Sequence, residues 1–579
     1  MGSSDRRPYE TATVLDQALL DECSGNEVCD LRMLVLISVP TGAFVTDTLY
    51  LSDRNMVVGE NFYDARLVFP PIKRNVGEIL TPQITFSTVS LVLSNVDGLF
   101  NPIMPSGQYY KSFVNQRVII KLGLGEVQST YDANVIFDGF VTEVGGFQRG
   151  TKSFTLICRD KFDDLKAKFP NTFFTSAEYP NIGDNVSGKP KPYILGDWTT
   201  NLEIAKDASI PTFIVNGADA NMNGEIGSTN NVQLVISENT NRVFDTTHVV
   251  IQRSDIAYVI NAADVVNVNG NKNYFEIVQN SGSTLIEGVN FIFKQSDKFF
   301  VKIEGASIDG PNTYPDNPVE QARFILETFG GAAPGDFTAN WDTLRDKAAP
   351  AQSAIVNIPS RIWVGKPVPA LDTALSILEQ IRCEGYINRS QEIDIQTMHW
   401  EDFDPSPSLV VRQDDIELNS FKMQIPDRNN INKAQGFFNF LPDIKEEYQA
   451  TVLRQNAAAV AAQKEIIKGL VFPNLYVQTD VINQLDEYLK LISGGREDIT
   501  VNQSWRVLTL DLGDWVKMDA KIQSTQFDGV PCWIRSIGFN SVGMKISLTY
   551  FSFQLLPFQT WNPGYSGIVG GQSASITDG

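Results

Sequence analysis

A series of short predicted strands within residues 87 to 165 constrains the fold of this chain more than any other feature. Alternation of apolar and polar residues predicts four strands, at 88–93, 117–122, 135–144 and 153–158. Turn-forming residues separate them, as in Asn95-Val96-Asp97-Gly98. Strands that each hide one face and reverse at such turns are typical of a small closed β-barrel.

A second copy of this pattern lies near the C-terminus. The triplet Phe-Asp-Gly occurs at 137–139 and again at 527–529. In each copy a Gly-Phe pair and an alternating strand follow, at Phe154 in the first copy and Ile546 in the second. One loop insertion accounts for the different spacing of both later landmarks. The sequence therefore indicates a duplicated β unit.

The duplication makes specific predictions about equivalent residues. Upstream of the triplets, the strand at 117–121 corresponds to residues 515–518. We predict that residues 100–165 and 505–555 form related barrels, with Asp138 equivalent to Asp528 and Phe154 equivalent to Ile546. Phe137 and Phe527 are expected to be buried at equivalent positions.

Length and charge indicate the number of domains and argue against nucleic-acid recognition. At 579 residues the chain is too long for one core, so three to five domains are expected. Asp and Glu number 68 against 47 Lys and Arg, which gives a net charge of −21. Such a surface repels phosphates, and sequence-specific binding of DNA or RNA is not expected.

Cysteine usage and apolar patterning point to folding in a reducing compartment without membrane insertion. The five cysteines are too few for a disulfide scaffold, although Cys23 and Cys29 could close a small loop. Three others, Cys158, Cys383 and Cys532, lie in apolar stretches. The N-terminal residues lack the apolar segment of a signal peptide, and no apolar run is long enough to span a bilayer.

The succession of elements predicts a mainly β fold with α+β insertions. Asn317, Pro318 and Glu320 predict the start of a helix, and apolar residues within 371–381 predict a second. Further helices are expected over 446–469 and from Thr479 or Asp480 to Gly494. The expected parts are an N-terminal arm at 1–30, a first β-barrel domain with an extended connector at 31–199, an inserted antiparallel β module at 200–310, an α+β module at 311–400, a strand plus helical insertion at 401–500, a second β-barrel at 501–556, and a flexible C-terminal tail at 557–579.

The sequence offers no catalytic, cofactor-binding or metal-binding residues. Phosphate-binding, zinc-protease and serine-nucleophile motifs are absent, and His248 and His399 lie in different predicted modules. Residues 219–224 resemble the first half of a calcium loop, but its twelfth position is Asn230 instead of Glu. An Asn/Gly turn between strands is the favoured interpretation. No cofactor is predicted.

Five segments together resemble the baseplate hub (tail hub) proteins of tailed bacteriophages. They are residues 91–102, the strand pair that begins at 137–139, the helix after Asn317-Pro318, the element 369–395 and the segment 510–516. The resemblance extends over roughly residues 31–556. It implies two small barrels related to the tail-tube fold in each chain, and a pseudo-sixfold ring formed by three chains at the end of the tail tube.

The resemblance further implies a structural virion protein without enzymatic activity. A homotrimer would contact the tail tube or a distal tail protein ring, the tape measure protein, and a central spike or tail fibre protein. It would be assembled in the host cytoplasm, let DNA pass without specific binding, and not insert into a membrane. An acidic bore is expected, with Asp511, Asp514 and Asp519 contributing to it.

Two alternatives from other classes remain open at the level of sequence. A carbohydrate-active enzyme of a phage tail would use a carboxylate pair, for which 68 acidic residues offer many combinations. A receptor-binding, adhesin-like tail protein would use residues 201–307 as its recognition module. That module and the insertion at 444–495 are the two departures from the hub pattern.

Overall fold

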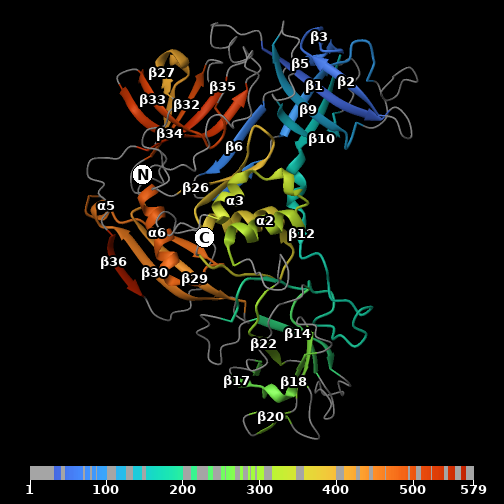
Figure 1. The fold of residues 1–579 in the computed structure, drawn as a ribbon, viewed down its shortest axis with the longest axis vertical. Helices are drawn as coiled ribbons and strands as arrows, with labels where there is room; N and C mark the ends of the chain where they lie inside the picture. The colour runs from blue at the N-terminus through green and yellow to red at the C-terminus, as the bar shows by residue number, and fades with distance from the viewer. Residues whose placement is uncertain are drawn as a thin grey trace.

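The computed structural model describes most of the chain between Leu31 and Ile568, and its elements extend along one long axis (Figure 1). Two large sheets lie side by side at one end, a helix-containing region lies in the middle, and a separate β module lies at the other end. The described residues are 31–40, 46–68, 72–78, 81–85, 88–100, 113–124, 135–145, 152–199, 210–217, 232–238, 249–253, 256–267, 274–277, 284–286, 289–291, 293, 297–305, 316–346, 358–398, 410–424, 431–442, 447–462, 464–492, 496–503, 510–522, 525–539, 546–553 and 563–568.

The first large sheet contains nine strands in the order β3-β4-β2-β1-β9-β10-β11-β8-β5. Neighbours are antiparallel except for the parallel pair β2 and β4. Alternation drives its formation, since Val89, Leu91 and Leu93 of β8 are fully buried while Thr88 and Ser90 are exposed. The strands are β1 (Leu31–Pro40), β2 (Thr46–Ser52), β3 (Met56–Val58), β4 (Asn61–Ala65), β5 (Leu67–Val68), β8 (Thr88–Ser94), β9 (Arg117–Leu124), β10 (Val135–Val144) and β11 (Ser153–Asp160).

The second large sheet has the order β27-β33-β34-β35-β32-β28. A hairpin from the N-terminal region also joins it, because β6 (Ile72–Glu78) pairs with β34 and β7 (Thr81–Thr85) pairs with β6. The main strands are β27 (Val410–Arg412), β28 (Lys422–Gln424), β32 (Arg496–Gln503), β33 (Trp515–Ile522), β34 (Thr525–Phe539) and β35 (Ile546–Phe553), with the short helices η9 (Gln413–Asp415) and η10 (Leu418–Ser420) between β27 and β28.

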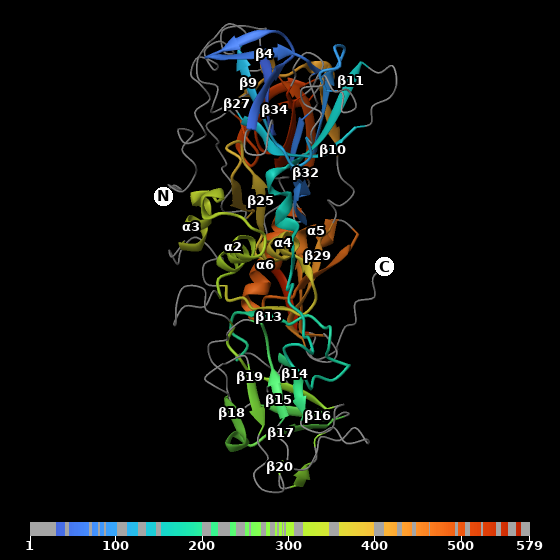
Figure 2. The same ribbon diagram turned by 90° about the vertical axis from the view of Figure 1, so that its right-hand side faces the viewer.

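The module at the far end of the molecule is a seven-stranded antiparallel sheet with its own core (Figure 2). Trp198, fully buried, extends from the preceding connector into this core. Its strands run in the order β17-β16-β22-β14-β15-β19-β18, namely β14 (Ile210–Gly217), β15 (Val232–Val235), β16 (Val250–Arg253), β17 (Ile256–Val259), β18 (Val265–Asn267), β19 (Tyr274–Ile277) and β22 (Lys298–Val301), with η5 (Ala262–Asp264) and the hairpin β20 (Thr284–Ile286) and β21 (Val289–Phe291) beside them.

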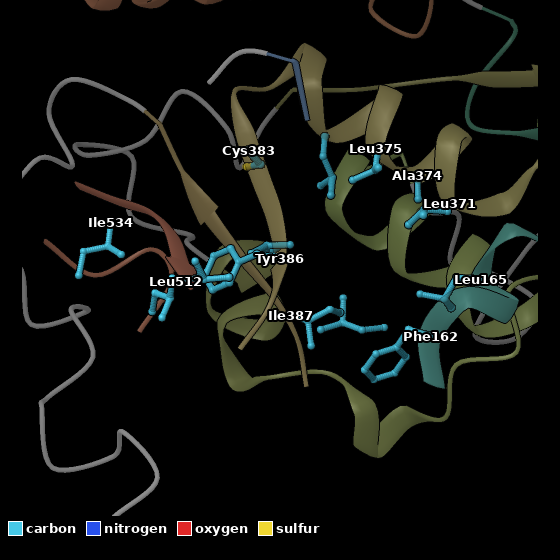
Figure 3. Packing of buried hydrophobic residues seen from close by; sticks show 14 of the residues in the cluster. Phe162, Leu165, Leu371, Ala374, Leu375, Cys383, Tyr386, Ile387, Leu512 and Ile534 are labelled. Atoms are coloured by element: carbon cyan, nitrogen blue, oxygen red, sulfur yellow. The ribbon is translucent and has the colours of Figure 1, made fainter. Parts of the chain in front are cut away.

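The middle region contains the predicted α+β elements. Helix α2 (Pro318–Thr328) starts where predicted, because the Asn317 side chain accepts hydrogen bonds from the backbone N–H groups of Val319 at 2.9 Å and Glu320 at 3.4 Å. Helix α4 packs against α2 and against the hairpin strand β25 (Figure 3). The remaining elements are η3 (Lys161–Lys166), β12 (Lys168–Phe169), β13 (Tyr193–Leu195), η7 (Pro334–Asp336), α3 (Ala339–Asp346), β23 (Ile362–Val364), β24 (Val368–Pro369), α4 (Ala370–Gln380), β25 (Cys383–Ile387) and β26 (Ile393–Thr397).

A four-stranded sheet covered by α6 (Gln478–Ile492) corrects two expectations. The helix predicted over 446–469 is wrong for most of its length, because β30 (Glu447–Asn456) precedes the short helix α5 (Ala457–Ala462) and β31 (Ile467–Phe472) follows it. The part expected as a flexible tail at 557–579 contains β36 (Pro563–Ile568). Strands β30 and β31 both pair with β29 (Lys433–Leu441), and β36 pairs with β30. Backbone pairing with strands distant in sequence therefore overrides local composition.

The mainly β fold with α+β insertions is confirmed. One cluster of buried apolar side chains includes members of both large sheets, α2, α4 and α6. Among the described residues, no helix combines the length and apolar character that a membrane crossing requires.

Candidate functional site

The central feature of the molecule is a pair of sheets with the same strand order. The first contains the order β9-β10-β11-β8, and the second contains β33-β34-β35-β32. In each sheet, the first of the four strands along the chain pairs antiparallel with the last, namely β8 with β11 and β32 with β35. Shared connectivity of this kind supports a duplicated unit more strongly than similar residue triplets do.

The turn before β9 and the turn before β33 have the same backbone geometry. Asn115 and Gly513 adopt positive φ angles of 65° and 82°. Their N–H groups donate to the carbonyls of Val141 at 2.7 Å and Ile534 at 2.9 Å. The reverse bonds also match, since the N–H groups of Val141 and Ile534 each donate, at 2.9 Å, to the carbonyl of the residue that follows the positive-φ residue.

Two β-bulges fix the residue equivalence along β10 and β34. In β10 the register skips Ile136 and Thr142, and in β34 it skips Gly529 and Arg535. The spacing between the two bulges is the same in both strands. The first bulge faces β9 in one sheet and β33 in the other, and the second faces β11 and β35. A bulge is a specific feature of strand pairing, and coincidence at two positions is strong evidence that the sheets are related.

The bulges confirm two predicted equivalences. Arg117 pairs with Phe140 and Trp515 pairs with Trp533, so the strand that begins at Arg117 matches the strand that begins at Trp515. Aligned on the second bulge, Phe154 is equivalent to Ile546.

The bulges also correct one equivalence. Asp138 is equivalent to Pro531, and Asp528 is equivalent to Val135, so the prediction that Asp138 matches Asp528 is wrong by three residues. The Phe-Asp-Gly triplets occupy different positions along β10 and β34. Phe137 is buried as expected, at 1% exposure, whereas the side chain of Phe527 lies outside the described part of the chain.

Strand β6 joins the N-terminal region to the second sheet. Its residues Ile72–Asn75 pair antiparallel with Ser536–Phe539 of β34, beyond the end of β33. The covered segment is buried, with exposures of 5% for Ser536, 2% for Ile537 and 3% for Phe539. The second sheet therefore incorporates a strand from a remote part of the chain.

A buried ion cluster holds this junction. Arg74 of β6 donates from Nη2 to Oδ1 of Asp511 at 2.9 Å, and the backbone N–H of Arg389 donates to Oδ2 at 2.6 Å. The Arg389 guanidinium also donates to the carbonyl of Leu510. Burial of Asp511 opposes its ionisation, but the charges of Arg74 and Arg389 outweigh it and hold the Asp511 pKa below its ordinary value. Three distant segments thus meet at one carboxylate.

The cluster corrects the predicted role of Asp511 and leaves the other two bore candidates in place. Asp511 is 7% exposed and paired, so its carboxylate cannot line an open channel. Asp514 is half-buried and accepts a hydrogen bond from the Asp511 backbone N–H at 2.7 Å. Asp519 is exposed. The acidic segment Leu-Asp-Leu-Gly-Asp is visible in the sequence. The arginines that contact Asp511, however, lie far away in the chain.

Close packing supports the same junction from the side of the hairpin. Tyr386 of β25 points toward Leu512 (Figure 3). A Cβ atom added to Gly513 would lie 2.6 Å from the Tyr386 hydroxyl oxygen. Gly513 therefore accommodates both its positive φ and this close approach, and a larger residue there would displace the end of the Tyr386 side chain.

A second group of acidic residues lies where β11 leads into η3. The guanidinium of Arg117 donates two hydrogen bonds to Asp138, at 3.0 and 2.8 Å. Asp160 caps η3 by accepting from the N–H of Phe162 at 3.0 Å. Burial raises the pKa of Asp160 to about 6, and the nearby charges of Asp138 and Asp163 act in the same direction.

This pKa predicts a pH-dependent effect of Asp160→Asn. The folded chain retains a proton on Asp160 that the unfolded chain releases, so stability falls as pH rises from about 4 to about 6. Asparagine stays neutral and can still accept the cap hydrogen bond. We expect the variant to melt above the wild type at pH 8, with the difference shrinking at pH 4.

Asp163→Asn is the matched control with the opposite sign. Although burial opposes its ionisation, hydrogen bonds from Lys166 at 2.7 Å and Arg159 at 2.9 Å lower the Asp163 pKa. This variant should melt below the wild type at pH 8. Equal shifts for both variants at all pH values would contradict the raised pKa of Asp160.

Several residues considered from the sequence lie outside the described part of the chain. They are the calcium-like segment 219–224, Asn230, His248, His399, Cys23 and Cys29. Cys158, Cys383 and Cys532 are buried. Within the described residues, no group of three or more His, Cys, Asp or Glu side chains is arranged to hold a metal ion.

Comparison with known proteins gives similarity at the level of structure. No protein-family model and no curated protein matches this sequence. A tail protein from Neisseria meningitidis is 7% identical with a TM-score of 0.39, and covers 90% of this chain and 96% of its own. A 43 kDa prophage tail protein from Shewanella oneidensis is 10% identical with a TM-score of 0.38, over 90% and 98%.

A third similar structure comes from a secretion system. An Escherichia coli component of the type VI secretion system, described as structurally similar to the T4 tail proteins gp27 and gp5, is 6% identical with a TM-score of 0.33. It covers 90% of this chain and 77% of its own.

Proposed function

We propose that this chain is a structural virion protein, a trimeric baseplate or tail hub that adapts a sixfold tail tube to a threefold tail tip. The observation that carries the proposal is the duplicated sheet, with the same strand order and the same two bulges in both copies. Three chains with two equivalent sheets present six similar units, so a threefold assembly can match a sixfold tube.

The proposed partners follow from this position. One face of the ring contacts the tail tube or a distal tail protein ring, and the other contacts a central spike or tail fibre protein. The tape measure protein and the DNA occupy the channel. The proposed location is the phage tail tip, and the proposed role is structural and not enzymatic.

The charge balance is compatible with a channel for DNA. The chain carries a net charge of −21, and clustered Lys and Arg would bind phosphates and hold DNA in place. We propose that acidic residues outnumber basic ones on the surface that faces the axis, with Asp514 and Asp519 among them.

Oligomeric state and DNA binding test this proposal together. We expect the purified chain to have three times the mass of one chain by light scattering, and to bind duplex DNA at physiological salt no better than millimolar, since the non-specific affinity of ordinary DNA-binding proteins is about 10⁻⁴–10⁻⁶ M. A stable monomer that hydrolyses cell-wall glycan would instead support the enzyme alternative. A trimer that binds DNA tightly would contradict the acidic bore.

A further inference from the structure

The two equivalent sheets differ at one edge, and the second sheet shows how that edge is filled. On one side of β34, β33 pairs with residues 525–533 and β6 continues with residues 536–539. On the other side, β35 pairs with residues 532–539. Both edges of β34 beyond the bulge at Arg535 are therefore paired, and the segment is buried.

The equivalent edge of β10 is open among the described residues. Beyond the bulge at Thr142, the residues equivalent to 536–538 are 143–145. Strand β9 pairs only with residues up to Phe140, and β11 occupies the opposite side. Within the described part of the chain, no strand pairs with residues 143–145 on the β9 side. Thr142 and Glu143 are exposed, and Val144 is half-buried.

The direction of the backbone groups identifies what the edge presents. The N–H of Gly145 donates to the carbonyl of Thr155 in β11 at 2.7 Å. Successive residues of a strand direct their backbone groups to opposite edges, so the N–H and C=O of Val144 face the open side. An unpaired strand edge of this kind is a template for pairing with another chain.

The chain order explains why no strand among the described residues fills this edge of the first sheet. Strand β5 is followed by the β6–β7 hairpin and then by β8, and β6 fills the edge of the second sheet. In the second sheet, β28 and β32 occupy the positions that β5 and β8 occupy in the first. The chain between β28 and β32 includes the helix α6 and the strands β29, β30 and β31, which belong to a separate sheet. One chain thus has two such edges and a described strand for one of them.

We propose that residues 143–145 of β10 pair with a β-strand from a second copy of this chain. The inference rests on the proposed trimer, in which each sheet of the ring has a neighbour on both sides. The junction between β6 and β34 is the model for it, because equivalent sheets in a closed ring meet through equivalent contacts. In each chain, β34 would then pair with β6 of the same chain, and β10 would pair with a strand of a neighbouring chain.

Val144→Pro tests the pairing directly. Proline removes the N–H that faces the open edge, and this N–H is not used in the pairing with β11. We expect the variant to raise the dissociation constant of the trimer by at least about tenfold. Val144→Thr keeps the branched side chain and the N–H, and should remain a trimer. The far-ultraviolet circular dichroism of both variants should match the wild type.

Hydrogen exchange of the wild-type protein tests the same edge without a substitution. In the trimer, the Val144 amide should exchange at least about tenfold more slowly than in the dissociated chain, because a strand from a second copy would protect it. This measurement keeps the proposal testable if the proline variant does not fold.

The outcomes separate this inference from the proposed function. A wild-type trimer with a rapidly exchanging Val144 amide, or a Val144→Pro variant that stays as tightly trimeric as the wild type, would overturn the strand pairing and leave the hub proposal standing. A wild-type chain that is monomeric at high concentration would overturn the trimer itself. A weakened trimer with Val144→Pro and an intact one with Val144→Thr would support the pairing.

Discussion

Asp511→Ala is expected to lower the free energy of unfolding by about 3–5 kcal/mol, the usual cost of removing one partner from a buried ion pair. The Asp511 carboxylate accepts from Arg74 at 2.9 Å and from the Arg389 backbone at 2.6 Å, inside a region that excludes water. Without it, the buried Arg74 guanidinium loses its ion-pair partner, and the buried Arg389 guanidinium loses a nearby opposite charge. Chemical denaturation of the wild type and the variant measures the difference.

The control lies in the strand that follows. Asp519 is exposed, and Asp519→Ala should change the free energy of unfolding by no more than about 0.5 kcal/mol. Because the Asp511 pKa is lowered, its contribution is present at neutral pH and is lost as pH falls below about 4. Equal stability of the two variants at pH 7 would contradict the role of Asp511 in holding β6 to the second sheet.

Phe137→Ala is expected to destabilise the chain by about 3–5 kcal/mol, because it removes a large apolar side chain and leaves a cavity. Phe137 is 1% exposed on β10 and lies opposite Ile120 of β9. The interior around it is close-packed, since a Cβ atom added to Gly139 would lie 2.7 Å from the Phe137 ring. The measurement is the free energy of unfolding by denaturant titration.

Phe62→Ala provides the matched comparison for an exposed ring. Phe62 lies on the hairpin strand β4 of the same sheet and is 57% exposed. Its truncation should leave the free energy of unfolding within about 0.5 kcal/mol of the wild type. A melting temperature that does not change in the Phe137 variant would show that this side chain is not part of the core.

Local residue patterns were sufficient to predict the central strands of the first sheet. Alternation of apolar residues predicts β8, β9, β10 and β11, because the side-chain period of a strand is a property of neighbouring residues. The start of α2 was equally predictable, since Asn317 caps the helix through bonds to residues two and three positions away. The mainly β class and the existence of a repeat follow from these short-range signals.

The exact equivalence within the repeat required the structure. The Phe-Asp-Gly triplets suggested one alignment, and the two bulges in β10 and β34 established another, three residues away. A bulge is defined by the pairing of two strands, so it leaves little trace in the sequence of either strand alone. The helix predicted over 446–469 failed for a related reason, because β29 pairs with the strands on both sides of the short helix α5.

The amino-acid sequence by itself determined the strand and helix periods, the acidic balance and the presence of two similar β units. Only the tertiary structure decided that β6 crosses to the second sheet and that Asp511 is a buried partner of Arg74, 437 residues away. The physical reason is the range of the interactions. Propensity and capping act within a few residues, whereas edge pairing and burial of a charge depend on segments that meet only in the folded chain.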